Sequence, residues 1–351
     1  MRYQRIILLS LGLVVGCICM FAQEKIQPKK GDGIQSLLIR HHRPGPEYRK
    51  QFIELNKGKL GKDNSLLLGV SYTLPPLKKR ETTTTSIAGK TGTKPAANDQ
   101  YAVGTKKREP LFGKKQAEYD IKSPELKGAT FYVVSGHGGP DPGAIGKMDG
   151  HRLHEDEYAY DIALRLARNL MMKGAKVHII IRDAVDGIRD ERILKNSKRE
   201  TCMGATIPQG QIARLRQRSA KVNELNRIDG KGYARGIFIH IDSRSKSKQT
   251  DVFFYHSPQT GSKQLANTMK ATFAGKYKRH QPGRGFTGTV SERSLYVLNN
   301  TVPVSVFVEL GNIQNPFDQR RFVIDDNRQA LANWMCEAFV TNYAQYKKKR
   351  K

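Results

Sequence analysis

Residues 133–146 of the chain read Val-Val-Ser-Gly-His-Gly-Gly-Pro-Asp-Pro-Gly-Ala-Ile-Gly. The β-branched run at 131–134 predicts a buried strand, and the glycines after it predict a tight turn with a close approach of the backbone. His137 therefore follows the carboxyl end of a strand, which is where open α/β sheets place ligand-binding groups. One histidine in a glycine-rich turn is weak evidence of function, so its significance depends on the residues that the fold brings beside it.

From Lys127 onward the chain alternates strand patterns with helix patterns. Apolar residues over 158–172 recur at helical spacing, which predicts an amphipathic helix that Gly174 ends. Strands separated by helices predict an α/β fold in which helices flank a mainly parallel sheet. Residues 184–216, rich in Arg, Lys and Gly, interrupt this alternation and are expected to form an insertion on one face. The further strands are expected at 177–181, 236–241, 252–255 and 304–309.

Three more polar residues stand where strands or helices are expected to begin or end. Glu155 opens the amphipathic helix, His240 lies in an apolar strand, and Glu309 ends another strand. Ordinary explanations exist, since an acid favours a helix N-terminus and a neutral histidine can be buried in a core. The carboxyl ends of parallel strands, however, share one edge of the sheet. Two histidines and a glutamate with an open fourth position are typical of catalytic zinc, and a spare glutamate can be its general base.

The order of the motifs around these residues resembles that of the zinc-dependent N-acetylmuramoyl-L-alanine amidases. The motifs are Gly-His-Gly-Gly-x-Asp-Pro-Gly-Ala, a glutamate before a helix, Ile-His-Ile-Asp, and Val-Glu-Leu-Gly-Asn-Ile. The resemblance spans residues 127–346, taken as the catalytic domain. It implies that Zn²⁺ is the cofactor, that the metal ligands are His137, Glu155 and His240, and that Glu309 is the catalytic residue. Arg182-Asp183 and Arg293 also match the family.

The chain departs from the family pattern beside two of these motifs. Val134-Ser135 stands where the family often has Asp-Pro, and residues 238–242 replace Ser-Ile-His-Ala-Asn. Neither change removes a ligand, but both alter the groups that orient the ligands. The assignment of the ligand to Glu155 rather than Glu157 rests on its spacing to the helix residues that follow.

The resemblance implies hydrolysis of the amide between the lactyl group of N-acetylmuramic acid and L-alanine of the stem peptide. Peptidoglycan is then the expected partner, and a protein activator is a further candidate. Two other interpretations stay open: a zinc peptidase on stem peptides, and a non-catalytic wall-binding protein that keeps the fold. The presence of all four polar residues argues against the second of these.

The formal net charge of +29 indicates a polyanionic partner. Behind an export signal, an anionic envelope polymer or membrane surface is expected rather than nucleic acid, although lysines that only keep the protein soluble explain the charge equally well.

The first residues are typical of an exported protein. Two arginines precede a short apolar run over 6–15, and cleavage is expected after Ala22, so residues 1–22 are predicted to be a signal peptide. The protein is therefore expected in the periplasm or cell envelope, and at the membrane only if Cys17 is lipidated. Two cysteines remain after cleavage and are expected to be unpaired: Cys202 and Cys336.

Residues 25–76 predict a small β-α-α-β unit. Gly31-Asp32, Asn56 and Leu74-Pro75 resemble the marks of a lysin motif (LysM), which implies binding to glycans that contain N-acetylglucosamine. A packing unit without a ligand is the alternative. Residues 77–109 carry basic, Thr and Gly residues with little apolar content, which predicts a basic flexible linker.

Overall fold

The computed structural model of the protein describes residues 24–28, 32–34, 37, 38, 41, 43, 46–77 and 100–350. The chain divides into two compact units, Met1–Thr93 and Lys94–Lys351. The signal peptide expected at residues 1–22, Cys17 and most of the expected linker lie outside the described residues. Within the described part of the chain, no helix combines the length and the apolar character needed to cross a membrane.

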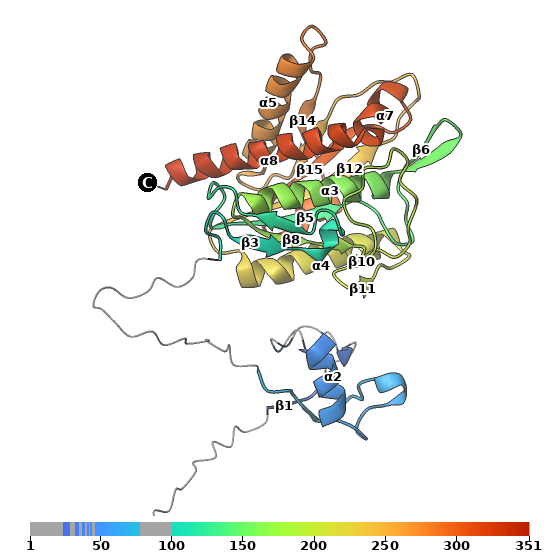
Figure 1. Cartoon of the computed structure of the whole chain (residues 1–351), viewed down its shortest axis with the longest axis vertical. Helices are drawn as coiled ribbons and strands as arrows, with labels where there is room; N and C mark the ends of the chain where they lie inside the picture. The colour runs from blue at the N-terminus through green and yellow to red at the C-terminus, as the bar shows by residue number, and fades with distance from the viewer. Residues whose placement is uncertain are drawn as a thin grey trace, which may run out of the picture. The chain divides into compact units, whose positions relative to one another are not determined.

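Within the described residues, the first unit contains a two-stranded sheet and the helix α2. Strand β1 (Lys25–Ile26) pairs antiparallel with β2 (Tyr72–Thr73), and helix α2 (Pro46–Leu55) and the short turn η1 (Lys62–Asn64) lie between them in sequence (Figure 1). Asn56 is fully buried: its amide donates to the carbonyl oxygens of Phe52 and Thr73, both at 2.8 Å, and accepts from Thr73 N at 2.7 Å. This side chain therefore joins the end of α2 to β2.

A six-stranded sheet forms the centre of the second unit, in the order β14-β13-β15-β12-β5-β8. The central strand β12 runs parallel to β5 and β15, and β13 runs antiparallel to β15 but parallel to β14. The α/β class is confirmed, and the sheet is mixed because of the β13–β15 pair. The strands are β5 (Ala129–Ser135), β8 (Lys176–Ile179), β12 (Tyr233–Asp242), β13 (Phe253–His256), β14 (Thr289–Glu292) and β15 (Val304–Asn312).

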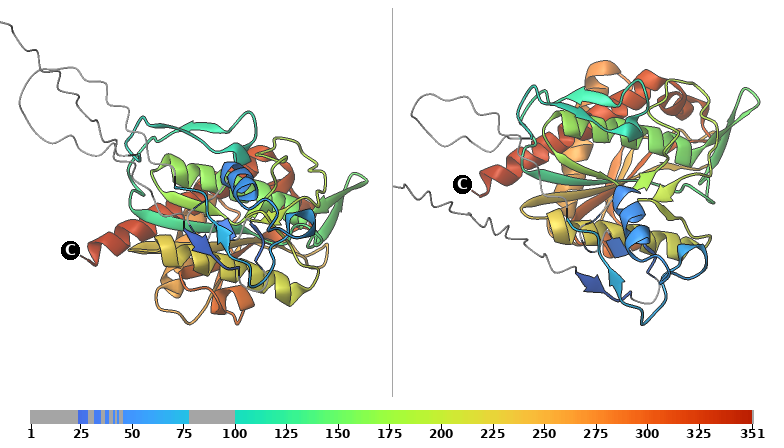
Figure 2. Two further views of the ribbon diagram at one scale, coloured as in Figure 1. Left: turned by 90° about the horizontal axis from the view of Figure 1, so that it is seen from below. Right: turned by 60° about the horizontal axis from the view of Figure 1, so that its bottom comes forward.

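Helices cover both faces of this sheet (Figures 1 and 2). One face packs against α3 (Glu155–Met172), α5 (Ser262–His280) and α8 (Asp325–Lys348), with α7 (Pro316–Val323) beside α8. The other face packs against α4 (Gln211–Asp229) and the short α6 (Tyr296–Asn299). Alternate side chains of each strand enter the two cores, as Phe131 and Tyr132 of β5 show.

The predicted helix at 158–172 is confirmed, and it begins at Glu155. The predicted strands are also present, although 177–181 divides into β8 and β9 (Ile181–Arg182). Strand β9 belongs to a separate small sheet with β10 (Thr201–Cys202) and β11 (Ala205–Thr206). The prediction of unpaired thiols is confirmed, because Cys202 and Cys336 are both free and buried.

Two boundaries differ from the prediction. Residues assigned to the linker form strand β3 (Lys106–Arg108), which pairs antiparallel with β4 (Glu118–Asp120) around the turn η2 (Pro110–Phe112). Phe112, buried against Tyr160 and Leu164 of α3, anchors this hairpin to that helix. The expected insertion at 184–216 ends earlier than predicted, because α4 begins at Gln211. A second hairpin, β6 (Ile145–Met148) with β7 (His151–His154), leads into α3.

Candidate active site

The glycine-rich turn after β5 has the backbone conformation that its sequence indicates. His137 has a φ of 53°, and Gly138 and Gly139 have φ values of 96° and 64°. A side chain at Gly136 would place its Cβ 2.4 Å from Cε1 of His240. Only glycine at this position therefore lets the His240 ring lie against the turn that carries His137.

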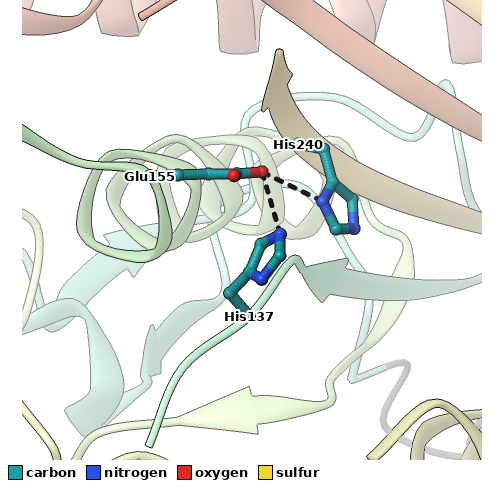
Figure 3. Close-up of side chains that lie close together, drawn as sticks. All are labelled: His137, Glu155 and His240. Atoms are coloured by element: carbon teal, nitrogen blue, oxygen red, sulfur yellow. Dashed lines mark hydrogen bonds and ion pairs between the residues drawn. The ribbon is translucent and has the colours of Figure 1, made fainter. Parts of the chain in front are cut away.

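The structure brings three of the predicted residues together, from the turn after β5, the first turn of α3, and β12 (Figure 3). Nε2 of His137 lies 3.2 Å from Oε1 of Glu155, and Nδ1 of His240 lies 3.0 Å from the same oxygen. Glu155 is itself fixed by the backbone, since Ile241 N donates to Oε1 at 3.0 Å and Ala144 N donates to Oε2 at 2.8 Å. Glu155, rather than Glu157, is the carboxylate that faces the two histidines.

These three side chains suit a divalent transition metal. Two imidazole nitrogens and one carboxylate oxygen form a typical zinc donor set. Ligand atoms around a tetrahedral zinc ion lie about 3.4 Å apart, given bonds of about 2.1 Å, and the separations of 3.0 and 3.2 Å are close to this spacing. Two backbone N–H groups hold Glu155, so little rearrangement is needed for binding.

The local charges keep Glu155 and His240 in the protonation states that metal binding requires, whereas His137 carries an extra proton. Burial raises the pKa of Glu155, but its hydrogen bonds with His137 and His240 outweigh burial and hold the pKa well below its usual range. Burial lowers the pKa of His240 in spite of its contact with Glu155, so this ring is neutral. Burial also lowers the pKa of His137, but hydrogen bonds with Asp141 and Glu155 raise it to about 10. A bound cation would displace that extra proton.

Asp141 orients the His137 ring. Its Oδ2 lies 2.8 Å from Nδ1 of His137 and accepts a hydrogen bond from Nη2 of Arg214 at 2.7 Å. Because Nδ1 is bonded to Asp141, Nε2 is directed to Glu155. The buried Arg218 donates to the carbonyl oxygen of His137, so two arginines one turn apart on α4 support this turn. In the sequence, Asp141 stands out only as part of a motif, and no local pattern marks either arginine.

Glu309 lies beside the three residues but outside their cluster. It stands opposite His240 in the parallel register of β12 and β15, so both side chains project from the same face of the sheet. Its Oε2 is buried and has no hydrogen-bond partner among the described residues. Burial, and then the charges of Glu155 and Asp242, raise the pKa of Glu309 well above its usual range. A carboxylate with a raised pKa is a stronger base.

The other residues that matched the family pattern have structural contacts. Arg182 Nε donates to the carbonyl oxygen of Ile179 at 2.8 Å, and Asp183 accepts from Val185 N and from Ser197 Oγ, both at 2.7 Å. The guanidinium of Arg293 lies 4.7 Å from the ring centroid of Tyr255, a residue of strand β13, which pairs with β15.

An α/β sheet that gathers two histidines, one fixed glutamate and a second buried glutamate is typical of a hydrolytic enzyme. The sequence model of the N-acetylmuramoyl-L-alanine amidase family matches residues 132–340, and the chain belongs to this family. It hydrolyses the amide between N-acetylmuramic acid and L-alanine in peptidoglycan, and it therefore acts on the cell wall.

The chain is also similar to individual amidases of known sequence or structure. The germination-specific N-acetylmuramoyl-L-alanine amidase of Bacillus subtilis (strain 168) is 25% identical over 196 residues, which cover 54% of this chain and 70% of that protein. The N-acetylmuramoyl-L-alanine amidase structure from Clostridium difficile 630 is 19% identical, covers 61% of this chain and 95% of that chain, and has a TM-score of 0.46. The structure of the CwlD amidase from Clostridioides difficile in complex with the GerS lipoprotein is 16% identical in sequence and has a TM-score of 0.45. The match covers 62% of this chain and 98% of the CwlD chain.

Proposed function

We propose that the amidase is zinc-dependent, with His137, Glu155 and His240 as the metal ligands and Glu309 as the general base. The observation that carries this proposal is the convergence of three donor atoms from segments up to 103 residues apart in sequence. Beside them lies a buried oxygen of Glu309 that has no hydrogen-bond partner among the described residues. Zinc at this point would polarise the substrate carbonyl and make a water molecule more acidic.

The residues of the chain then have distinct tasks in the reaction. Glu155 stays ionised under its two backbone donors, and Asp141 keeps Nε2 of His137 directed to the cluster. Glu309 accepts a proton from water as the water oxygen attacks the lactyl carbonyl carbon. The C–N bond breaks, and Glu309 returns the proton to the amino group of L-alanine as it leaves.

Two measurements test the proposal. Metal analysis of the purified chain should give about one zinc ion at this donor set, and chelation should abolish activity that zinc then restores. Full activity in zinc-free protein would contradict it. Mass spectrometry of digested peptidoglycan separates the alternatives, because an amidase releases intact stem peptides that begin with L-alanine. A peptidase would release shortened peptides, and a non-catalytic wall-binding protein would release nothing.

We further propose that residues 1–22 direct export and are removed, which N-terminal sequencing of the mature protein tests. Retention of Cys17 with an attached lipid would instead place the enzyme at the membrane. A protein activator stays a candidate partner, and a comparison of turnover by the pure enzyme with turnover in an envelope extract tests for it.

Residues 25–76 are proposed to be a LysM-like module that binds N-acetylglucosamine-containing glycan, with residues 127–346 as the catalytic domain. The small core of the first unit, and the bonds of Asn56 between α2 and β2, support an independently folded module.

A further inference from the structure

A second group of acidic side chains lies beside the first turn of α3. One carboxylate oxygen from each of Asp156, Glu157 and Glu200 lies within 4.8 Å of the other two. The three residues are only 2%, 1% and 6% exposed. The proposed amidase reaction gives none of them a role, so their burial needs another explanation.

The protein groups around this cluster do not neutralise it. Nη1 of Arg189 pairs with Glu157 at 2.9 Å, and Gly139 N donates to Oε2 of Glu200 at 2.8 Å. Oδ1 of Asp156 accepts from Glu157 N at 2.9 Å, but its Oδ2 is buried without a hydrogen-bond partner among the described residues. In the described part of the chain, three buried carboxylates thus pair with one arginine, and the nearby His137 is itself paired with Asp141 and Glu155.

The position of Asp156 and Glu157 at a helix N-terminus does not account for their burial. The helix dipole stabilises such an acid only weakly. Removing an unpaired carboxylate from water costs more free energy than the dipole supplies. The difference requires either a proton or a bound cation within the cluster.

The geometry favours a divalent cation with oxygen ligands. Calcium takes carboxylate oxygens at about 2.3–2.6 Å, so oxygens around one ion lie up to about 5 Å apart. The three oxygens all lie within 4.8 Å of one another, which is close enough for one ion to contact all three. Oxygen-only donors favour a hard cation over zinc. A divalent ion and Arg189 together would balance the three carboxylates, whereas one proton and Arg189 would leave a negative charge.

We propose that Asp156, Glu157 and Glu200 bind a calcium ion, apart from the amidase metal site, and that this ion holds the turn of His137 in place. Glu200 bonds the backbone two residues after His137, and Asp156 directly follows Glu155. The ion therefore links the segment that carries Glu200 to two of the three elements that supply ligands of the amidase site, the turn of His137 and α3.

Thermal unfolding of the zinc-loaded full chain tests the proposal. The protein is freed of other metals on a chelating resin, reloaded with one equivalent of zinc, and titrated with calcium chloride. Calcium should raise Tm by about 5–10 °C at a hundredfold excess over its Kd, and calorimetry should show one equivalent of calcium bound while the zinc content stays constant. The absence of a calcium shift in the wild type would mean that a proton occupies the cluster, and would overturn the proposal.

Two variants locate the effect. Asp156→Asn keeps the shape of the side chain and removes the charge, so it should lose the calcium shift. Glu191→Gln changes an exposed acid in the segment that carries Glu200, and this variant should keep the calcium shift. A calcium shift that survives in Asp156→Asn would place the ion elsewhere and overturn the proposal. If Asp156→Asn does not fold, Glu200→Gln and the calorimetric titration of the wild type make the same distinction.

Discussion

His240 on β12 stands directly opposite Glu309 on β15 in a parallel pair of strands. Parallel register directs the two side chains to the same face of the sheet. Phe307, two residues before Glu309, stacks on His240 with the ring centroids 4.3 Å apart. One pair of strands therefore supplies both a proposed metal ligand and the proposed base. The two roles can be separated by mutation.

Glu309→Gln is expected to keep its zinc and lose about 10²- to 10⁴-fold in kcat, the usual contribution of a general base. The substitution keeps the volume of the side chain and removes its ability to accept a proton. Turnover on a soluble muropeptide and zinc content are measured on the same preparation. Loss of zinc together with activity would make Glu309 a ligand, and His240→Ala, which should lose both, is the matched control.

Asp141→Asn is expected to weaken zinc binding by about 10- to 100-fold, because Asp141 sets the orientation of the His137 ring. Competition with a zinc-binding dye measures this affinity. At saturating zinc the variant should recover most of its kcat, since Asp141 does not contact the substrate in the proposed reaction. An unchanged zinc affinity would show that the turn alone orients His137.

The elements with strong periodic patterns could be predicted from the sequence. The β-branched runs around Val133 and Val306 indicate strands, and the helical spacing after Glu155 indicates a helix. The structure has β5, β15 and α3 at these places. The closeness of His137, Glu155 and His240 could be predicted, because each of them follows, opens or interrupts such a pattern. The direction of β13 could not, since residues 253–256 carry no signal that distinguishes parallel from antiparallel pairing.

The supporting residues of the site were missed for a different physical reason. Arg214 and Glu200 lie in a charged segment that reads as a solvated surface, and their partners Asp141 and Gly139 are 73 and 61 residues away. Strand β3 is similar, because Lys106–Arg108 has no apolar residue and depends on Phe112 to anchor the hairpin. Such contacts follow from the tertiary fold and leave no local pattern.

Asp161→Ala is expected to destabilise the catalytic unit by about 3–5 kcal/mol, because it leaves the buried Arg165 and Arg328 without this carboxylate partner. Oδ2 of Asp161 accepts from Arg165 Nε at 2.8 Å and from Arg328 Nε at 2.6 Å, and Arg328 is fully buried. Urea denaturation measures the change in free energy of unfolding. Asp190→Ala, which removes an exposed partner of Arg165, is the control and should change stability by less than about 1 kcal/mol. Equal losses in the two variants would show that the buried network adds nothing of its own.

Deletion of residues 25–76 is expected to weaken binding to intact sacculi and to spare hydrolysis of small soluble muropeptides. A tethered glycan-binding module raises the effective concentration of the catalytic unit at the wall without adding chemistry. Co-sedimentation with sacculi, at low and at high salt, measures the loss, and kcat/KM on a soluble muropeptide measures the intact activity. The salt series separates binding by the module from binding by the net charge of +29, because attraction of the basic chain to an anionic wall falls as salt rises.

Asn56→Ala in the full chain should reproduce the deletion, since it breaks the hydrogen bonds that join α2 to β2. Unchanged sedimentation of both variants would leave the basic charge as the wall anchor and remove the module from the binding mechanism.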